Sequence, residues 1–244
     1  QRTVNGNAGV WVLDTDRGIQ RRPTFGDERD SGPVWFPDGR RIAVNPERTG
    51  VYDIFERPAD GSGRETALLS SPEPKIASDW SPDGRSLLFD VQSREGARDI
   101  WVLPIDGDRK PVQITKTPFG EQSGQFSPDG RWIAYQSNET GRDEIYVQSF
   151  PDLKVKVQVS VRGGGLAFWR RDGRELFYEA PDQRIMAVPI DLSATGVNPG
   201  TPAALFASTG NWLPSPDGQR FLVTVETEPP APITLILNWA GLPK

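Results

Sequence analysis

The chain has 244 residues, of which 36% are hydrophobic, so it is long enough and apolar enough to bury a sizeable core. Its formal net charge of −5 and pI of about 5.0 predict no general affinity for nucleic acid or for an anionic membrane surface. With no cysteine and no histidine, it can form neither disulfides nor thiolate- or His-ligated metal sites, and Ser-His-Asp and Cys-His catalysis are excluded.

The longest uncharged apolar runs are short, such as Ile233 to Leu237. They predict no membrane-spanning helix, and the first residues lack the pattern of a secretory signal peptide. We therefore expect no direct membrane insertion by this chain. The 25 glycines and 23 prolines are spread along the whole length, which is typical of many short strands joined by turns.

A tight turn built on an Asp-Gly pair recurs along the chain. Five copies occur, and their glycines are separated by 45, 46, 43 and 45 residues. Proline presets φ, aspartate bonds back to the backbone and glycine supplies a positive φ, so these segments predict the same turn each time. The copies are FPDGRRIAV (36–44), SPDGRSLLF (81–89), SPDGRWIAY (127–135), RRDGRELFY (170–178) and SPDGQRFLV (215–223). A nearly constant period of this length indicates a repeat protein.

Two predicted strands, A and B, flank each turn. Strand A ends four positions before the glycine, at an aromatic residue in four copies and at proline in the fifth: Trp35, Trp80, Phe126, Trp169 and Pro214. Strand B follows the turn at once, and its apolarity on both faces predicts a strand buried on both sides. Aromatic residues at one fixed position are expected to pack between neighbouring sheets rather than to form a stacking platform for sugars or bases.

A third strand, C, begins about ten residues after strand B, and a shorter strand, D, follows it. Strand C is expected at 9–16, 52–58, 99–106, 144–151, 184–191 and 233–239. Strand D is expected near 22–25, 68–69, 112–115, 157–161 and 204–206. Four strands in a period of about 45 residues, with no sustained helical period, are the sequence signature of β-propeller blades.

We therefore predict an all-β fold, a single β-propeller domain over 1–244 with about six four-stranded blades, the first and last incomplete. The blade pieces are expected approximately at 1–27, 28–72, 73–117, 118–162, 163–209 and 210–244. Alternatively, the terminal pieces merge into one blade, which gives five blades and a spare strand. In either arrangement the chain starts in mid-blade, so we expect the natural polypeptide to continue upstream.

The WSPDG-like turns and the Ile-Trp-Val or Ile-Tyr-Val strands that follow them resemble those of TolB-type, WD-repeat-like propellers along nearly the whole chain. Several segments are similar, more closely, to the C-terminal propellers of bacterial receptor-type serine/threonine kinases: QRTVNGN (1–7), NPERTG (45–50), DWSPDGR (79–85), 124–151, WRRDGRELFY (169–178) and ITLILNWAGLPK (233–244). In that group a cytoplasmic kinase and a membrane segment precede the propeller. The resemblance implies a sensor or interaction module, periplasmic or otherwise extracytoplasmic, that does no chemistry itself.

No catalytic residue, metal ligand or cofactor is predicted. The repeated aspartates occupy the turn position at which Asp caps backbone groups, so we interpret them as structural: Asp38, Asp83, Asp129, Asp172 and Asp217. Gly163 to Gly165 are followed by neither a Walker sequence nor a helix, which indicates a loop that leads into a strand. The sequon at Asn138 is interpreted as a solvated turn.

Binding residues are expected on one rim. In a propeller the D-to-A and B-to-C loops share one rim and the A-to-B turns share the other. The Asp-Gly turns are nearly alike, whereas the D-to-A loops vary in length, charge and aromatic content, as binding surfaces on rigid scaffolds do. The candidates are Arg29, Asp30, Lys75, Asp79, Phe119, Glu121, Gln122, Arg162, Asn211 and Trp212. Their mixed charge suits a protein, peptide or small-molecule ligand, with Trp212, Phe119, Arg29 and Arg162 as the expected anchors.

Three classes of function stay open. The leading hypothesis is a non-catalytic propeller that binds a ligand or partner for signalling. The second is an accessory propeller of a hydrolase or peptidase, whose G-x-S-x-G elbow and histidine would lie outside this chain. The third is a component of a TolB-like envelope complex, although TolB proteins carry an extra N-terminal domain that this sequence does not show.

Overall fold

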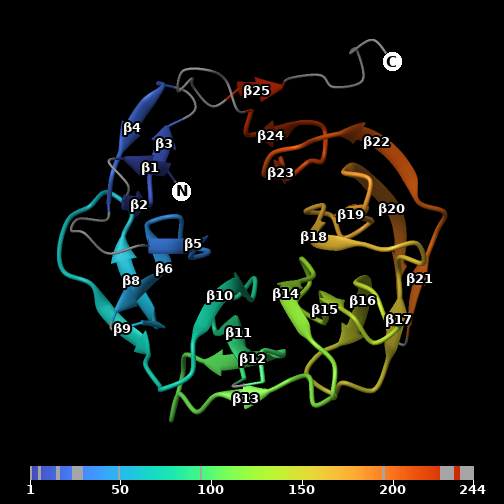
Figure 1. The fold of residues 1–244 in the computed structure, drawn as a ribbon, viewed down its shortest axis with the longest axis horizontal. Coiled ribbons are helices and arrows are strands. Elements are labelled where there is room, and N and C mark those ends of the chain that lie inside the picture. The colour runs from blue at the N-terminus through green and yellow to red at the C-terminus, as the bar shows by residue number, and fades with distance from the viewer. Residues whose placement is uncertain are drawn as a thin grey trace. The chain divides into compact units, whose positions relative to one another are not determined.

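A computed structural model describes residues 2–4, 7–14, 17–23, 30–48, 50–93, 95–193, 196–225 and 234–236. Every regular element in these residues is a β-strand, which confirms the predicted all-β class. The chain divides into two compact units, Gln1–Gly124 and Gln125–Lys244, and each is described by itself (Figure 1).

Unit 1 contains two short hairpins and two larger sheets, all antiparallel, drawn from blue to green in Figure 1. The hairpins are β1 (Arg2–Val4) with β2 (Asn7–Gly9), and β3 (Val12–Asp14) with β4 (Ile19–Arg21). The first larger sheet has the order β5 (Asp30–Trp35), β6 (Arg41–Arg48), β8 (Ile54–Pro58) and β9 (Thr66–Leu69), with β7 (Val51–Tyr52) also paired to β6. The second has the order β10 (Lys75–Trp80), β11 (Ser86–Gln92), β12 (Arg98–Pro104) and β13 (Val112–Gln113).

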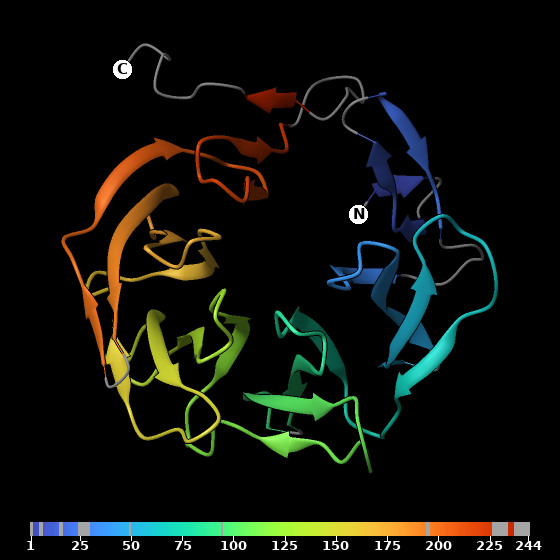
Figure 2. The same ribbon diagram turned by 180° about the vertical axis from the view of Figure 1, so that it is seen from behind.

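Unit 2 contains three antiparallel sheets, which Figure 2 shows from the side opposite to Figure 1. The first has the order β14 (Glu121–Phe126, which begins before the unit boundary), β15 (Trp132–Ser137), β16 (Glu144–Ser149) and β17 (Lys156–Gln158). The second has the order β18 (Gly165–Trp169), β19 (Glu175–Glu179), β20 (Arg184–Leu192) and β22 (Ala203–Ala207), with β21 (Val197–Pro199) also paired to β20. The third comprises β23 (Trp212–Pro214), β24 (Phe221–Val223) and β25 (Thr234–Ile236).

The predicted strand order A–B–C–D is confirmed. We number the blades in chain order: blade 1 is β3–β4, blades 2 to 5 are the four larger sheets, and blade 6 is β23–β25. One boundary was predicted wrongly, because strand D of blade 1 lies at Ile19–Arg21 rather than near 22–25. The chain reverses in a tight turn, in which the Gly18 N–H donates to the Asp14 carbonyl at 2.8 Å, so strand D starts sooner than expected.

The Asp-Gly turns have one common geometry. Their glycines all have left-handed φ values, from 64° at Gly39 to 73° at Gly173. In blade 3 the Asp83 carboxylate accepts the Ser81 hydroxyl at 2.6 Å and the Arg85 N–H at 3.1 Å. These two hydrogen bonds hold the pKa of Asp83 below its ordinary value. The interpretation of the turn aspartates as backbone caps is therefore confirmed.

The core lies between successive sheets within each unit. Strand B is buried on both faces as predicted: Ile42, Ala43 and Val44 are at most 1% exposed. Trp80 and Trp169 are also buried, as expected for aromatic residues that pack between sheets. Trp35 is an exception, because its side chain is 49% exposed and the next residue, Phe36, stacks on Trp80 with ring centroids 4.0 Å apart.

A polar side chain recurs in strand B six residues after each turn glycine: Asn45, Asp90, Gln136, Glu179 and Thr224. Three of them bond to strand A of the following blade. Asn45 Oδ1 accepts the Ala77 N–H at 2.8 Å, Asp90 Oδ2 accepts the Ser123 N–H at 3.0 Å, and Glu179 Oε2 accepts the Trp212 indole N–H at 3.1 Å. We call these contacts interblade clamps. They join neighbouring blades, and the clamp of Asn45 lies where strand A carries a bulge, between Ala77 and Asp79.

The clamp at Asp90 carries an electrostatic penalty that the clamp at Asn45 lacks. Burial raises the pKa of Asp90 to about 7, against the opposing effects of the Ser123 N–H and the Arg98 charge. Its Oδ1 atom has no hydrogen-bond partner among the described residues. Asn45 is uncharged, and its amide also donates to the Gly32 carbonyl at 3.0 Å.

Gly84→Val is expected to lower the free energy of unfolding by about 1–3 kcal/mol, because a β-branched residue would be forced to a left-handed φ. The φ of Gly84 is 70°. Thermal unfolding measures the loss. Gly196→Val is the control, because Gly196 has no left-handed φ and a Cβ there would lie 3.6 Å from Ser193 Oγ. Equal melting temperatures for wild type and Gly84→Val would show that backbone strain at this turn is negligible.

Asp90→Asn is expected to stabilise the protein at pH 8 but not at pH 4. The buried carboxyl holds its proton to about pH 7 in the folded state, so its contribution to stability falls as the pH rises from about 4 to 7. The amide keeps an acceptor for the Ser123 N–H and stays uncharged, as at Asn45. Urea unfolding should show a variant advantage that grows by about 1–3 kcal/mol between pH 4 and pH 8. An advantage independent of pH would contradict the raised pKa.

Candidate functional site

Several predicted binding residues in unit 1 are buried and serve the scaffold instead. Lys75 is 1% exposed, and its ammonium group lies 2.5 Å from Asp53 Oδ1 and 3.0 Å from the Ser71 carbonyl. Asp30 and Glu121 are 2% and 0% exposed. These three side chains cannot meet a ligand at the surface, so their expected role as exposed contacts is corrected. The sequence marks them only as charged loop residues and does not show their burial.

The other unit 1 candidates are more accessible. Phe119 is 39% exposed, and Asp79 and Gln122 are half-buried. The Gln122 side-chain oxygen accepts the Arg98 guanidinium at 3.2 Å. Arg29 lies outside the described residues. Phe119 is therefore the exposed aromatic candidate among the described residues of this unit.

In unit 2, too, some of the predicted binding residues are buried and others are exposed. Trp212 is 3% exposed, its indole N–H is bound by Glu179, and its ring packs edge-on against Phe168 at 5.0 Å. It is a core residue, so the expected exposed anchor at Trp212 is corrected. Arg162 and Asn211 are exposed.

A buried carboxylate shapes the D-to-A loop between blades 4 and 5. Glu144 starts strand C of blade 4 and is 0% exposed. Its Oε1 accepts Arg142 Nε at 2.7 Å and the Gly163 N–H at 2.9 Å, and its Oε2 accepts the Ser160 hydroxyl. Burial, and then the charge of Glu144, raises the pKa of Tyr178. The loop that carries Arg162 is therefore held by ion pairing and hydrogen bonding at its base.

The glycines of this loop are required by close packing. A Cβ on Gly163 would lie 2.3 Å from Pro181 Cγ, and one on Gly164 would lie 2.8 Å from Ser160 Oγ. Strand β18 begins at Gly165, which confirms that the triple glycine is a loop leading into a strand. The next residue, Leu166, has a left-handed φ of 50° and is 42% exposed.

Two adjoining hollows lie against this loop in unit 2. The first, which we call the Gly163 hollow, has a volume of about 520 Å³ and is lined by Gln136, Arg142, Asp143, Gly163, Gly164, Gly165, Leu166, Glu179, Ala180, Pro181 and Gln183. The second, the Val161 hollow, has about 620 Å³ and is lined by Val161, Arg162, Gly163, Tyr178, Ala180, Pro181, Asp182, Arg184, Met186, Thr201, Pro202 and Ala204. They share Gly163, Ala180 and Pro181. Both belong to D-to-A and B-to-C loops, and the sequence prediction had named Arg162 alone among their residues.

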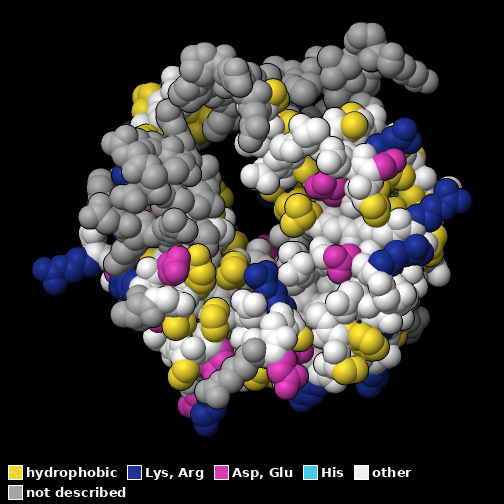
Figure 3. Space-filling view, in the orientation of Figure 1, with side chains coloured by type: hydrophobic (Ala, Val, Ile, Leu, Met, Phe, Trp, Pro, Cys, Tyr) yellow, Lys and Arg dark blue, Asp and Glu magenta, His cyan; other side chains and the backbone are white. Residues whose placement is uncertain are grey.

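The hollows combine exposed apolar side chains with charged groups of both signs. Val161 and Leu166 are 63% and 42% exposed and offer apolar contact. The nearby charges are of both signs, and no group of three or more potential metal ligands occurs in the described part of the chain. Figure 3 shows hydrophobic, basic and acidic side chains intermingled on the viewed face of unit 2. The described residues include no helix long and apolar enough to cross a membrane.

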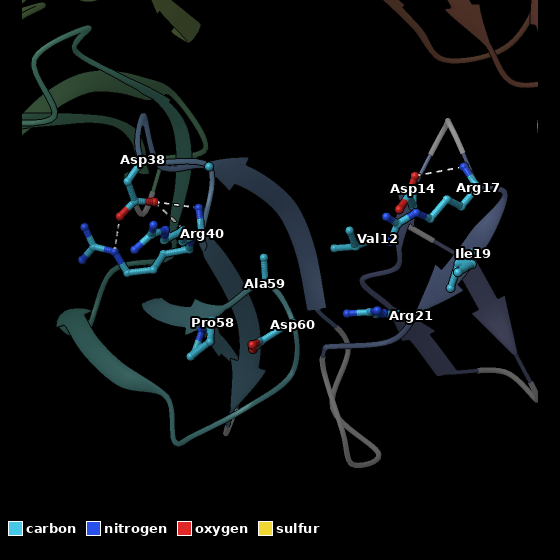
Figure 4. Close-up of a pocket in the computed structure, with 12 residues that line it drawn as sticks. Val12, Asp14, Arg17, Ile19, Arg21, Asp38, Arg40, Pro58, Ala59 and Asp60 are labelled. Atoms are coloured by element: carbon cyan, nitrogen blue, oxygen red, sulfur yellow. Dashed lines mark hydrogen bonds and ion pairs between the residues drawn. The ribbon is translucent and has the colours of Figure 1, made fainter.

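A larger hollow, of about 770 Å³, lies in unit 1 beside an Asp-Gly turn (Figure 4). Figure 4 shows Asp38 and Arg40 on one side of it, Asp14 and Arg17 on the other, and Asp60 between them. The carboxylates are occupied by local structure: Asp38 by Arg41 and the Arg40 N–H, and Asp14 by the Arg17 N–H. This arrangement serves turns, so we place the candidate site at the hollows of unit 2.

Comparisons with known proteins identify the family. The family model described as TolB beta propeller domain matches residues 61–215. The chain belongs to the TolB β-propeller domain family. The structure of TolB from Acinetobacter baumannii is similar with a TM-score of 0.73 and 18% identity, over 89% of this chain and 54% of that one. At this identity the likeness shows the fold alone.

Two bacterial proteins are similar to this chain over part of its length. Protein Atu1656 of Agrobacterium fabrum is 36% identical over 84 residues, which are 33% of this chain and 27% of that protein. Peptidase YuxL of Bacillus subtilis is 32% identical over 89 residues, which are 36% of this chain and 13% of the peptidase. The matched regions thus span about a quarter and about an eighth of these relatives.

The TolB-type fold also occurs in enzymes. An oligogalacturonate lyase in complex with manganese is similar with a TM-score of 0.64 and 13% identity, over 90% of this chain and 69% of the lyase. TolB itself and the lyase therefore share this architecture, and the fold does not decide between binding and catalysis.

Glu144→Gln is expected to lower the free energy of unfolding by about 1–3 kcal/mol, because a buried charge with three donors is replaced by a neutral amide. Hydrogen exchange of the Gly163 N–H should also accelerate, since that group donates to Glu144. Urea unfolding and exchange measured by NMR test both effects. Asp106→Asn is the control, because Asp106 is 77% exposed and pairs with Arg85 at 3.6 Å, a surface contact worth less than about 1 kcal/mol. A loss no larger than the control's would contradict the anchoring role.

Proposed function

We propose that this chain is a non-catalytic interaction module that binds a protein or peptide partner through the Gly163 and Val161 hollows of unit 2. The observation that carries the proposal is the pair of adjoining hollows, which exposes apolar side chains beside a loop fixed by a buried carboxylate. A rigid base with exposed apolar groups lowers the entropy lost on binding. Interaction with other proteins is common among propeller proteins, which supports the same reading.

The cellular role that we propose is sensing outside the cytoplasm, as the extracytoplasmic part of a bacterial signalling kinase. The resemblance of segments such as DWSPDGR (79–85) to receptor-kinase propellers supports this role. Membership of the TolB β-propeller family supports an envelope or periplasmic setting. A kinase domain in the natural polypeptide upstream of residue 1, found by sequencing the gene, is the expected result.

An accessory propeller of a peptidase is the second candidate function. The 32% identity to part of peptidase YuxL favours it, and the catalytic groups would then lie in another segment of the polypeptide. In that case the hollows of unit 2 would contact a substrate peptide or the catalytic domain. A hydrolase domain encoded in the same gene would decide for this alternative.

The binding face can be tested with a phage library of random linear peptides selected on the immobilised chain. Arg162→Ala and Leu166→Gly are expected to weaken selected peptides by about 10- to 100-fold, because a true anchor contributes about 2 kcal/mol or more. Leu166→Gly removes an exposed side chain and also relieves the left-handed φ, so it should not destabilise the fold.

Arg85→Ala and Arg131→Ala are the matched controls, because both arginines are exposed and follow Asp-Gly turns. Their affinities should equal that of the wild type in isothermal titration calorimetry. Losses confined to Arg85 and Arg131, or the failure of any peptide to be enriched, would contradict the proposed function.

A further inference from the structure

We propose that the Gln136 side-chain amide is a recognition group in the floor of the Gly163 hollow, which binds the backbone N–H and C=O of one residue in an extended, non-acidic peptide segment. This inference rests on the proposed function of the same site and names its ligand chemistry. The juxtaposition that carries it is a largely buried side chain, whose amide has no hydrogen-bond partner among the described residues, beside the exposed apolar Leu166 in one hollow.

Gln136 occupies the clamp position of blade 4, six residues after Gly130. At the same position Asn45, Asp90 and Glu179 each bond to strand A of the next blade. The Gln136 side chain makes no hydrogen bond with any described residue, although the next blade lies against it. A Cβ built on Gly165 would lie 3.0 Å from Gln136 Oε1, so the amide sits directly over that glycine.

The burial of Gln136 makes this lack of a partner significant. Its side chain is 9% exposed, yet it lines the hollow. The amide atoms of Gln136 open onto the hollow, so a ligand that supplies both a donor and an acceptor can bond to them directly in place of water. A primary amide offers an acceptor oxygen and donor hydrogens side by side. The N–H and C=O of one residue in an extended chain belong to successive peptide groups and point to the same side, so they complement it.

The surroundings disfavour an acidic segment, because the exposed carboxylate of Asp143 also lines the hollow and would repel it. The guanidinium of Arg142 is engaged by Glu144 and by the Val161 carbonyl at 2.7 Å, and the Glu179 carboxylate is engaged by Trp212. Leu166 lines the wall of the hollow and is 42% exposed, so its side chain can pack against an apolar side chain of the ligand. An amide in the floor and an apolar wall together match one residue of an extended peptide better than they match a charged group or a bare sugar.

The direct test is an NMR titration of the ¹⁵N-labelled chain with the blocked tripeptide N-acetyl-Ala-Leu-Ala-amide, at concentrations that reach about 5 mM for weak binding. The side-chain NH₂ signal of Gln136 is assigned by its absence in Gln136→Met. We expect it to shift with the tripeptide, together with the Leu166 backbone signal, and to shift much less with glucose, which carries no amide. The inference is overturned if the chemical shift of the Gln136 side chain does not change with the tripeptide, or if it changes as much with the sugar.

The proposed function is tested separately in the same titration. Shifts at Val161 and Arg162 without a shift at Gln136 would leave the binding face in place and overturn only the role of Gln136. If neither Val161 and Arg162 nor Gln136 shows a chemical-shift change, both the proposed function and the role of Gln136 are contradicted.

Variants distinguish a binding group from a structural clamp. Gln136→Met keeps the shape of the side chain and should leave the melting temperature unchanged, while the affinity for the tripeptide falls about tenfold. Asn45→Leu is the matched control at the same repeat position, and it should lower the melting temperature because it breaks two hydrogen bonds. If Gln136→Met destabilises the protein as much as Asn45→Leu does, Gln136 is a structural clamp and the inference fails.

Discussion

The interblade clamp, which occurs six residues after three of the five turn glycines, fixes how the blades that it joins meet. Apolar faces such as Ile42 and Leu87 bring neighbouring sheets together without fixing their register, because hydrophobic contact is non-directional. A buried polar side chain is stable only if it is hydrogen-bonded. The bond that Asn45 Oδ1 accepts from the Ala77 N–H therefore favours one register between the two neighbouring sheets. The clamp thus converts a generic apolar interface into one defined arrangement of adjacent blades.

The loops that carry the candidate site are fixed by a second recurring device at the start of strand C. Asp53 accepts Lys75 at 2.5 Å and the Ser70 hydroxyl at 2.6 Å, while Glu144 accepts Ser160 and the Gly163 N–H. Each carboxylate ties a D-to-A loop to the strand beneath it. Because the loops are pinned from below, their outward side chains can vary without disturbing the sheets, and a surface of this kind can be specific without being flexible.

The repeat made the sheets predictable, because the Asp-Gly turns and the apolar B strands are local signals with a fixed period. The exposure of single residues was not predictable in the same way. Trp35 and Phe36 are adjacent aromatic residues, and the sequence does not show which of them is buried. Phe36 is buried because it packs against Trp80, whereas Trp35 is exposed. Trp212 was expected at the surface because its loop varies, but the Glu179 clamp draws it into the core. The sequence does contain a signal for the clamp, because a polar residue stands six positions after each turn glycine. A search for periodic apolar residues overlooks it.

Repeats also give a way to separate structural from functional departures. Asp90 departs from Asn45 in charge, yet it still bonds to the next blade, so its departure changes stability and pH dependence. Gln136 departs in a different way, because it keeps a polar, largely buried side chain and lacks the interblade bond that Asn45, Asp90 and Glu179 make. A buried amide that only clamped blades would gain nothing from losing its partner. The unpaired amide therefore makes sense where a partner arrives from outside, which is why the Gly163 hollow, rather than the larger hollow beside the Asp-Gly turn, carries the proposed ligand contact.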